Sequence, residues 1–199
     1  MLLLGAGWLG CLPALWAGDP GAPWIDGVGT GLRRHSHALG VVAGVGWGGS
    51  QWGSRQPHDL AWLGARYSWI VSDVLAADSW WRGNVELAGE LFGGGQFSPS
   101  GRYLCGMTPF LVYNFATGTP WMPFIGAGAG VTLTNIGEPD LSTRFQFNDQ
   151  LVLGTHYFFD ERVATTFQYR FVHLSNAGIR EPNNGVNTHM VFAGVTWFY

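Results

Sequence analysis

Near the C-terminal end of the chain, a histidine and a serine are separated by a single residue. His173 and Ser175 continue a row of aromatic residues, Phe167, Tyr169 and Phe171, at every second position. Side chains of a β-strand alternate between its two faces, so this row shares one face and His173 and Ser175 lie about 6–7 Å apart. A serine hydroxyl becomes an effective nucleophile when an imidazole takes its proton. The pair is compatible with a hydrolase, but on its own it does not distinguish an enzyme from a structural polar pair at the rim of a barrel.

The surroundings of this strand decide which ester the pair meets. In a water-soluble sheet the aromatic row would belong to the core. In a membrane barrel the row would face lipid, while Gln168 and Arg170 on the opposite face would line a polar interior. The second arrangement presents the histidine and serine to a lipid substrate.

The rest of the chain favours the membrane barrel. Eight segments of alternating side chains are separated by turn residues, and they cover residues 36–48, 59–71, 82–94, 103–116, 121–134, 144–157, 162–176 and 186–199. They are longer than the usual soluble strand of about 5–6 residues and sufficient for a tilted bilayer crossing of about 9–11 residues. One residue, Asp149, breaks the alternation of the sixth segment by placing a carboxylate on its apolar face. We predict an all-β fold, an eight-stranded antiparallel transmembrane β-barrel with up-and-down topology.

Composition agrees with this fold class and excludes others. Charged residues make up 12% of the 199 residues, about half the share of soluble domains. The net charge of −3 provides no basic surface for nucleic acid. No uninterrupted apolar run reaches the roughly 20 residues of a spanning helix, and without one a membrane protein has to be a closed barrel.

The chain divides into three parts. Residues 1–17 are predicted to be a signal peptide, because Leu2 to Leu15 is apolar and small residues precede a cleavage site after Ala17. Residues 18–35, rich in glycine and proline, are expected to form a lead-in, and residues 36–199 the barrel. Removal of the signal peptide would leave Cys105 as the single cysteine and thus no intramolecular disulfide.

The residues around the His–Ser pair resemble a family signature. The run His173-Leu-Ser-Asn-Ala-Gly-Ile179, followed by Pro182-Asn-x-Gly-x-Asn187, is similar to the motif of the lipid A 3-O-deacylases, also grouped as acyloxyacyl hydrolases. The resemblance implies an integral enzyme of the Gram-negative outer membrane. Its substrate would be lipid A within lipopolysaccharide, from which it removes an ester-linked acyl chain.

The same resemblance assigns residue roles. Ser175 would be the nucleophile and His173 the general base, with both on the lipid-facing surface of the barrel. Asn183 and the backbone N–H of Gly178 would stabilise the oxyanion, and Asn176 would shape the site. No metal or organic cofactor is implied, and the resemblance leaves open whether the barrel works as a homodimer.

One position departs from the family pattern, which has a glutamate where this chain has Asn187. An asparagine can orient a histidine but cannot supply negative charge. We expect Asn187 to be the third catalytic residue. The alternative is a non-enzymatic small outer-membrane barrel, structural or adhesive, that retains a degenerate motif. A soluble barrel of the lipocalin type is a third interpretation, in which the polar faces point at solvent.

Overall fold

Eight antiparallel strands close into a single barrel in the computed structural model, which describes residues 22–199. The predicted signal peptide and residues 18–21 of the predicted lead-in lie outside the described residues. The strands are β1 (His37–Gly49), β2 (Asp59–Ile70), β3 (Gly83–Ser98), β4 (Arg102–Phe115), β5 (Trp121–Thr134), β6 (Phe145–Phe158), β7 (Val163–Ser175) and β8 (Val186–Phe198). Each strand pairs with its neighbour in sequence, and β1 pairs with β8. The predicted fold class and meander are confirmed.

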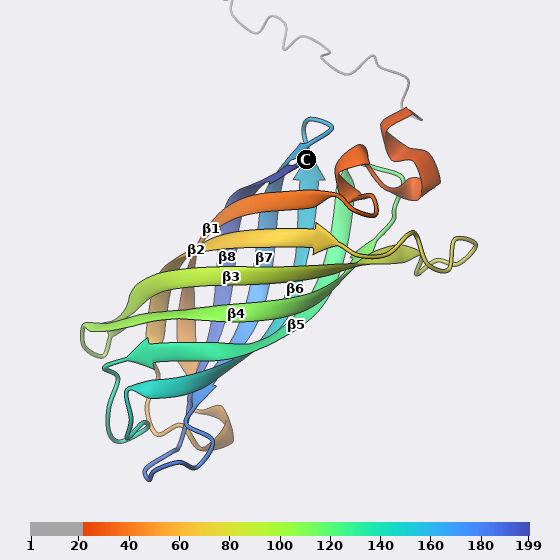
Figure 1. Ribbon diagram of the computed structural model, residues 1–199. Helices are drawn as coiled ribbons and strands as arrows, with labels where there is room; N and C mark the ends of the chain where they lie inside the picture. Colours follow the sequence, from red (N-terminus) through yellow and green to blue (C-terminus); the bar gives the residue numbers. More distant parts are fainter. Residues whose placement is uncertain (1–21) are drawn as a thin grey trace, which may run out of the picture.

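The connections divide between the two ends of the barrel (Figure 1). One end, which we call the loop end, carries residues 50–58, 99–101, 135–144 and 176–185. The other end carries residues 71–82, 116–120 and 159–162, together with the lead-in and the C-terminus. The loop end therefore brings the start of the 176–185 connection, which directly follows Ser175, close to three other loops.

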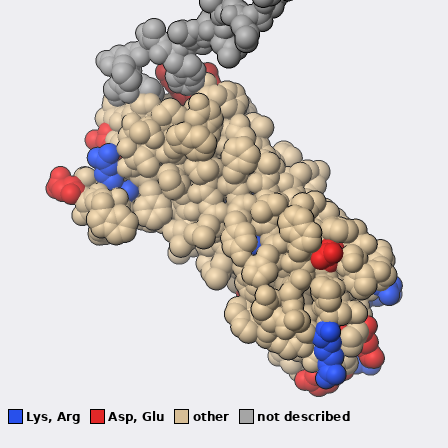
Figure 2. Space-filling view, turned by 180° about the vertical axis from the view of Figure 1, so that it is seen from behind, with Lys and Arg blue, Asp and Glu red and all other residues tan. Residues whose placement is uncertain are grey.

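An apolar band covers the outside of the barrel. Outward positions of the strands expose large hydrophobic side chains, among them Val41, Leu63, Leu91, Leu111 and Leu151. Figure 2 shows charged side chains gathered toward the two ends, with a central stretch that is almost free of them. Such a band is the surface that a bilayer-spanning barrel presents to lipid. None of the helical segments within residues 22–199 is long and apolar enough to cross a membrane.

The interior holds both polar and apolar side chains, and its Arg–Glu pairs join neighbouring and distant strands. Arg170 makes two hydrogen bonds to the Glu90 carboxylate, at 2.6 and 2.7 Å, and Arg66 pairs with Glu86 at 3.0 Å. The inward-facing polar side chains pair with one another as expected, but the interior is not polar throughout. Apolar clusters occupy both ends of the barrel interior, because the loops and the lead-in cover these ends and exclude water.

The lead-in closes the end opposite the loop end. Its short helical segments η1 (Ala22–Gly27) and η2 (Thr30–Leu32) place Val28 and Leu32 in an apolar cluster with Phe158 and Phe198. The Asn84 side-chain amide donates to the Leu32 carbonyl oxygen. Residues 22–35 of the lead-in are thus part of the folded barrel.

The main boundary difference concerns β3, which extends to Ser98 although the sequence pattern stops at residue 94. Glycines 93–95 give no alternation, yet their backbone continues to pair with β4. A Cβ on Gly94 would lie 2.5 Å from the Trp62 Cβ, so close packing across β2 and β3 requires a glycine there. The connection that follows is correspondingly short.

Candidate active site

Strand β7 presents His173 and Ser175 on its outward face, in the same row as the aromatic residues that precede them. Burial alternates along the strand, with Val172 and Leu174 inside the barrel and the row from Phe167 to Ser175 outside. The register of β7 with β8 sets His173 directly opposite Asn187. Two residues separated by 14 positions are thereby brought into contact.

The contact between these two side chains is a hydrogen bond of 2.7 Å between His173 Nδ1 and Asn187 Oδ1. An amide oxygen only accepts, so Nδ1 carries the proton and donates it. In a neutral imidazole this leaves Nε2 unprotonated. That tautomer is the one a general base needs.

Ser175 is half-buried at the end of β7 and shares the outward face with His173. Among the hydrogen bonds of residues 22–199, none joins its hydroxyl to the His173 ring. Catalytic hydrogen bonds are often long in ligand-free enzymes and shorten when substrate binds. The two groups are neighbours on the outward face of β7.

The 176–185 connection places the other three residues that the motif singles out. Asn176 is fully buried, and its amide donates to the Arg180 carbonyl oxygen at 2.7 Å. Its Oδ1 accepts the Gly178 N–H at 3.0 Å, and its own N–H donates to Asn183 Oδ1 at 2.8 Å. Asn176 therefore fixes the shape of the turn, and the Gly178 N–H is engaged within it. The Asn183 Nδ2 has no partner among the described residues.

Gly185 ends this connection directly against the catalytic candidate. Its φ of +81° lies in the left-handed region, and a Cβ there would be 2.8 Å from His173 Cε1. Only glycine combines this backbone conformation with so close an approach. Glu181, the acidic residue of the loop, accepts the Asn183 N–H and is not bonded to His173.

The connection between β1 and β2 also reaches the site, which the sequence did not indicate. Asn187 Nδ2 donates to the Gln51 carbonyl oxygen at 2.6 Å. Trp52 follows in the short segment η3 (Gln51–Gly53), with its ring edge-on to Phe171 at 5.0 Å and to His173 at 6.2 Å between centroids. These contacts span more than 100 positions, so no local motif announces them.

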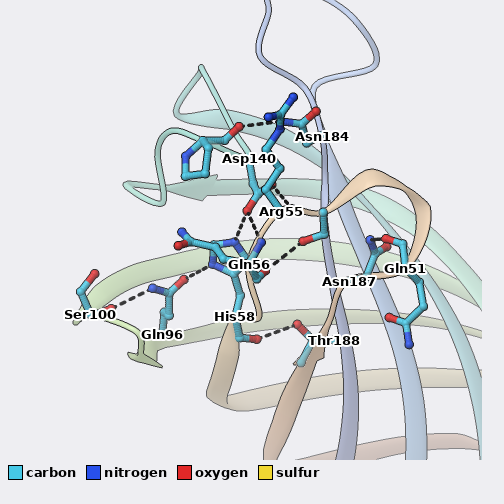
Figure 3. A network of polar contacts seen from close by, with 12 residues as sticks. Gln51, Arg55, Gln56, His58, Gln96, Ser100, Asp140, Asn184, Asn187 and Thr188 are labelled. Carbon is cyan, nitrogen blue, oxygen red and sulfur yellow. Dashed lines mark hydrogen bonds and ion pairs between the residues drawn. The ribbon is translucent and has the colours of Figure 1, made fainter.

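A buried polar network holds this connection in place (Figure 3). The Asp140 carboxylate accepts the backbone N–H groups of Arg55 and Gln56 and bonds His58 Nε2 at 2.9 Å. The carbonyl oxygen of Asp140 accepts the N–H groups of Asn184 and Gly185. Asp140 and His58 are almost completely buried. Asp140 thus joins the 50–58, 135–144 and 176–185 connections through its carboxylate and its backbone carbonyl.

A groove opens on the outer surface beside His173. It has a volume of about 370 Å³, and Trp52, Ala127, Leu151 and Phe171 provide much of its lining. Asp149 lies on the same groove and pairs directly with His173 across β6 and β7. The residue that breaks the sequence alternation therefore places an exposed carboxylate on the lipid-facing surface next to the imidazole.

Metal-ligating side chains do not gather at this site. Within residues 22–199, no group of three or more His, Cys, Asp or Glu side chains is arranged to hold a metal ion. The chemistry available to the described residues is that of a hydroxyl, an imidazole and amides, with one carboxylate nearby. This set is suited to acyl transfer.

Sequence comparisons match this chain to known lipid A deacylases. The family model described as lipid A 3-O-deacylase (PagL) matches residues 43–196. The lipid A deacylase PagL of Pseudomonas aeruginosa is 30% identical over 123 residues, which cover 57% of this chain and 68% of that protein.

Solved structures support the fold. The crystal structure of the outer membrane enzyme PagL superimposes with a TM-score of 0.57 at 24% identity, covering 78% of this chain and 97% of that one. Neisserial surface protein A gives a TM-score of 0.60 at 15% identity, covering 81% and 96%. Because the family model spans most of the chain, including the whole His–Ser segment, the chain belongs to the lipid A 3-O-deacylase (PagL) family.

Proposed function

We propose that this protein is an integral outer-membrane esterase that removes the 3-O-linked acyl chain of lipid A by a serine-hydrolase mechanism. The observation that carries the proposal is the 2.7 Å bond from His173 to Asn187, because it leaves Nε2 free on the face where Ser175 lies. Family membership supports the substrate class, and the apolar band supports the location.

The first half of the reaction follows from these groups. The Ser175 hydroxyl attacks the ester carbonyl while His173 Nε2 takes its proton. The carbonyl π electrons move onto oxygen, and the oxyanion needs hydrogen-bond donors. Asn183 Nδ2 is a candidate donor, because the Asn176 N–H holds the Oδ1 of this amide and no hydrogen bond of the described residues engages its nitrogen. The Gly178 N–H serves as a second donor once Asn176 Oδ1 releases it.

Collapse of this intermediate completes acylation. The C–O bond to the sugar breaks, and the imidazolium returns its proton to the leaving 3-oxygen. Water then attacks the acyl-serine while His173 Nε2 takes its proton. The acyl C–O bond to Ser175 breaks, the imidazolium returns the proton to Ser175 Oγ, and a free fatty acid leaves. Asn187 holds the imidazole in position throughout but remains neutral. Asp149, which faces His173 on the same groove, is the nearby carboxylate that can stabilise the imidazolium through space.

The groove beside His173 supports a long-chain acyl substrate. Its walls are largely apolar side chains, and it lies on the outer surface of the barrel, where a lipid reaches it without leaving the membrane. Among the described residues, the cavity enclosed between Arg66, Glu86 and His156 inside the barrel has a volume of only about 10 Å³, which is too small for an acyl chain.

Mass spectrometry of lipid A from cells that express the protein tests the proposal. Cells with the parent chain should lose the mass of one hydroxyacyl group, and cells with Ser175→Ala should not. A heat-dependent shift in gel mobility would establish that both barrels are folded. An unchanged lipid A spectrum with the folded parent would refute the proposed activity and favour the non-enzymatic barrel.

A further inference from the structure

The side-chain amide of Asn187 is held at both of its polar atoms. Its oxygen accepts from His173 Nδ1 at 2.7 Å, and its nitrogen donates to the Gln51 carbonyl oxygen at 2.6 Å. Asn187 is fully buried, so water does not replace either partner. Figure 3 shows Asn187 and Gln51 side by side, where the 50–58 connection lies next to β8.

The Gln51 carbonyl fixes the orientation of this amide. A backbone carbonyl oxygen only accepts hydrogen bonds, so the group that faces it has to be the NH₂ of Asn187. The amide oxygen is then directed at His173, which sets the tautomer of the imidazole. Gln51 therefore acts on the catalytic histidine through Asn187.

We propose that the 50–58 connection is a positioning element of the active site, and that its Gln51 carbonyl makes an amide, not a carboxylate, the matched third group at position 187. A carboxylate there would present one oxygen to His173 and the other to the Gln51 oxygen. Two acceptors about 2.6 Å apart repel each other, and the Gln51 carbonyl oxygen would keep only the longer bond from the Ser54 N–H, at 3.4 Å. The proposal deepens the proposed function and rests on it.

Several contacts keep the Gln51 carbonyl facing the side-chain nitrogen of Asn187. Asp140 anchors the 50–58 connection through the N–H groups of Arg55 and Gln56. The Gln51 side-chain nitrogen lies 3.4 Å from His189 Nε2. An amide nitrogen only donates, so Nε2 accepts, and His189 Nδ1 donates to the Tyr169 hydroxyl at 2.5 Å. The 50–58 connection is thus anchored after Gln51 by Asp140 and at Gln51 by its own side chain, which keeps its carbonyl facing Asn187.

The nearly isosteric substitution Asn187→Asp tests this matching. We expect turnover to fall by about 10- to 100-fold with little change in KM, because the histidine and not the lipid-binding groove is disturbed. Asn135→Asp is the matched control. It introduces the same charge at the same end of the barrel, and its Oδ1 keeps its role as acceptor for the Tyr103 N–H. A rise in turnover with Asn187→Asp would overturn the proposal.

A double-mutant cycle separates the role of the connection from that of Asn187 alone. Asp140→Asn weakens the anchor, so the Gln51 carbonyl can withdraw from a carboxylate. In that background, Asn187→Asp should lower turnover by less than about threefold. Effects that simply multiply would overturn the role of the connection, since additivity indicates independent sites.

A measurement without substrate keeps this inference distinct from the proposed function. The ¹⁵N resonances of His173 in the full-length refolded barrel should show a protonated Nδ1 and an unprotonated Nε2. The opposite tautomer would overturn the proposed orientation even in an active protein. The expected tautomer in a folded barrel that leaves lipid A intact would refute the activity and retain the orientation.

Discussion

Replacing Gly185 with alanine moves the candidate base without touching its hydrogen-bond partner. The new Cβ would lie 2.8 Å from His173 Cε1 and 3.5 Å from Nδ1, whereas ordinary carbon contacts begin near 3.4 Å. The ring therefore has to shift by about 0.6 Å or more. A misplacement of about 1 Å in a catalytic group costs up to about 100-fold in rate, so we expect Gly185→Ala to lower turnover by about 10- to 100-fold.

The same substitution also strains the backbone, which needs a control. Gly185 has a φ of +81°, and an L-residue in that region costs about 1–2 kcal/mol. Gly118→Ala imposes a similar strain at φ +72° in the β4–β5 connection, at the opposite end of the barrel, where the nearest side-chain atom is 3.5 Å away. Its turnover should stay near that of the parent.

The assay is the initial rate of fatty-acid release from purified lipopolysaccharide by detergent-solubilised protein. Rates are divided by the folded fraction, which the heat-dependent gel shift measures. The reasoning is refuted if folded Gly185→Ala retains more than about a third of the parent rate. Equal losses in the two glycine variants would also refute it, because strain alone would then account for the effect.

Three further changes test other parts of the structure. Asp149→Asn should lower turnover about three- to tenfold, since it removes the carboxylate that faces His173, and an unchanged rate would exclude a Coulombic contribution. Trp52→Ala should raise KM for lipid A severalfold in the same assay, because it removes one wall of the groove; an unaltered KM would exclude that wall from binding. Glu90→Gln should destabilise the barrel by about 3–5 kcal/mol in urea unfolding, because it leaves Arg170 buried without its anion. Adding Arg170→Met should recover most of that loss, and a Glu90→Gln barrel as stable as the parent would contradict the argument.

The fold could be predicted from the sequence because the alternation of polar and apolar side chains is a local property of each strand. Each strand carries its own pattern of two faces, and eight patterns without a spanning helix leave a closed barrel as the solution. The environment of the inward side chains is harder to predict from the sequence. Whether an inward side chain meets water or an apolar cluster depends on what covers the ends, and Leu32 and Leu141 reach those ends from segments without alternation.

The sequence predicts those parts of the candidate site that lie close together along the chain. His173 and Ser175 are neighbours on one strand, and Asn187 follows after one connection. Gln51 and Trp52 could not be inferred, because the closure of β1 against β8 brings them to the site and no spacing encodes that closure. Asp149 is visible in the sequence as a carboxylate on an otherwise apolar face. Only the register of β6 with β7 shows that it faces His173.

The groove opens sideways, onto the surface that the bilayer surrounds, while packed side chains block the lumen. A molecule arrives at His173 by lateral diffusion in two dimensions, so the relevant concentration is its mole fraction in the membrane and not its amount per litre. Diluting the substrate with inert detergent at constant total lipopolysaccharide should therefore slow the reaction, as surface dilution does for interfacial enzymes. The released fatty acid enters the same layer, where its accumulation competes for the groove and makes the enzyme sensitive to how fast the membrane clears it.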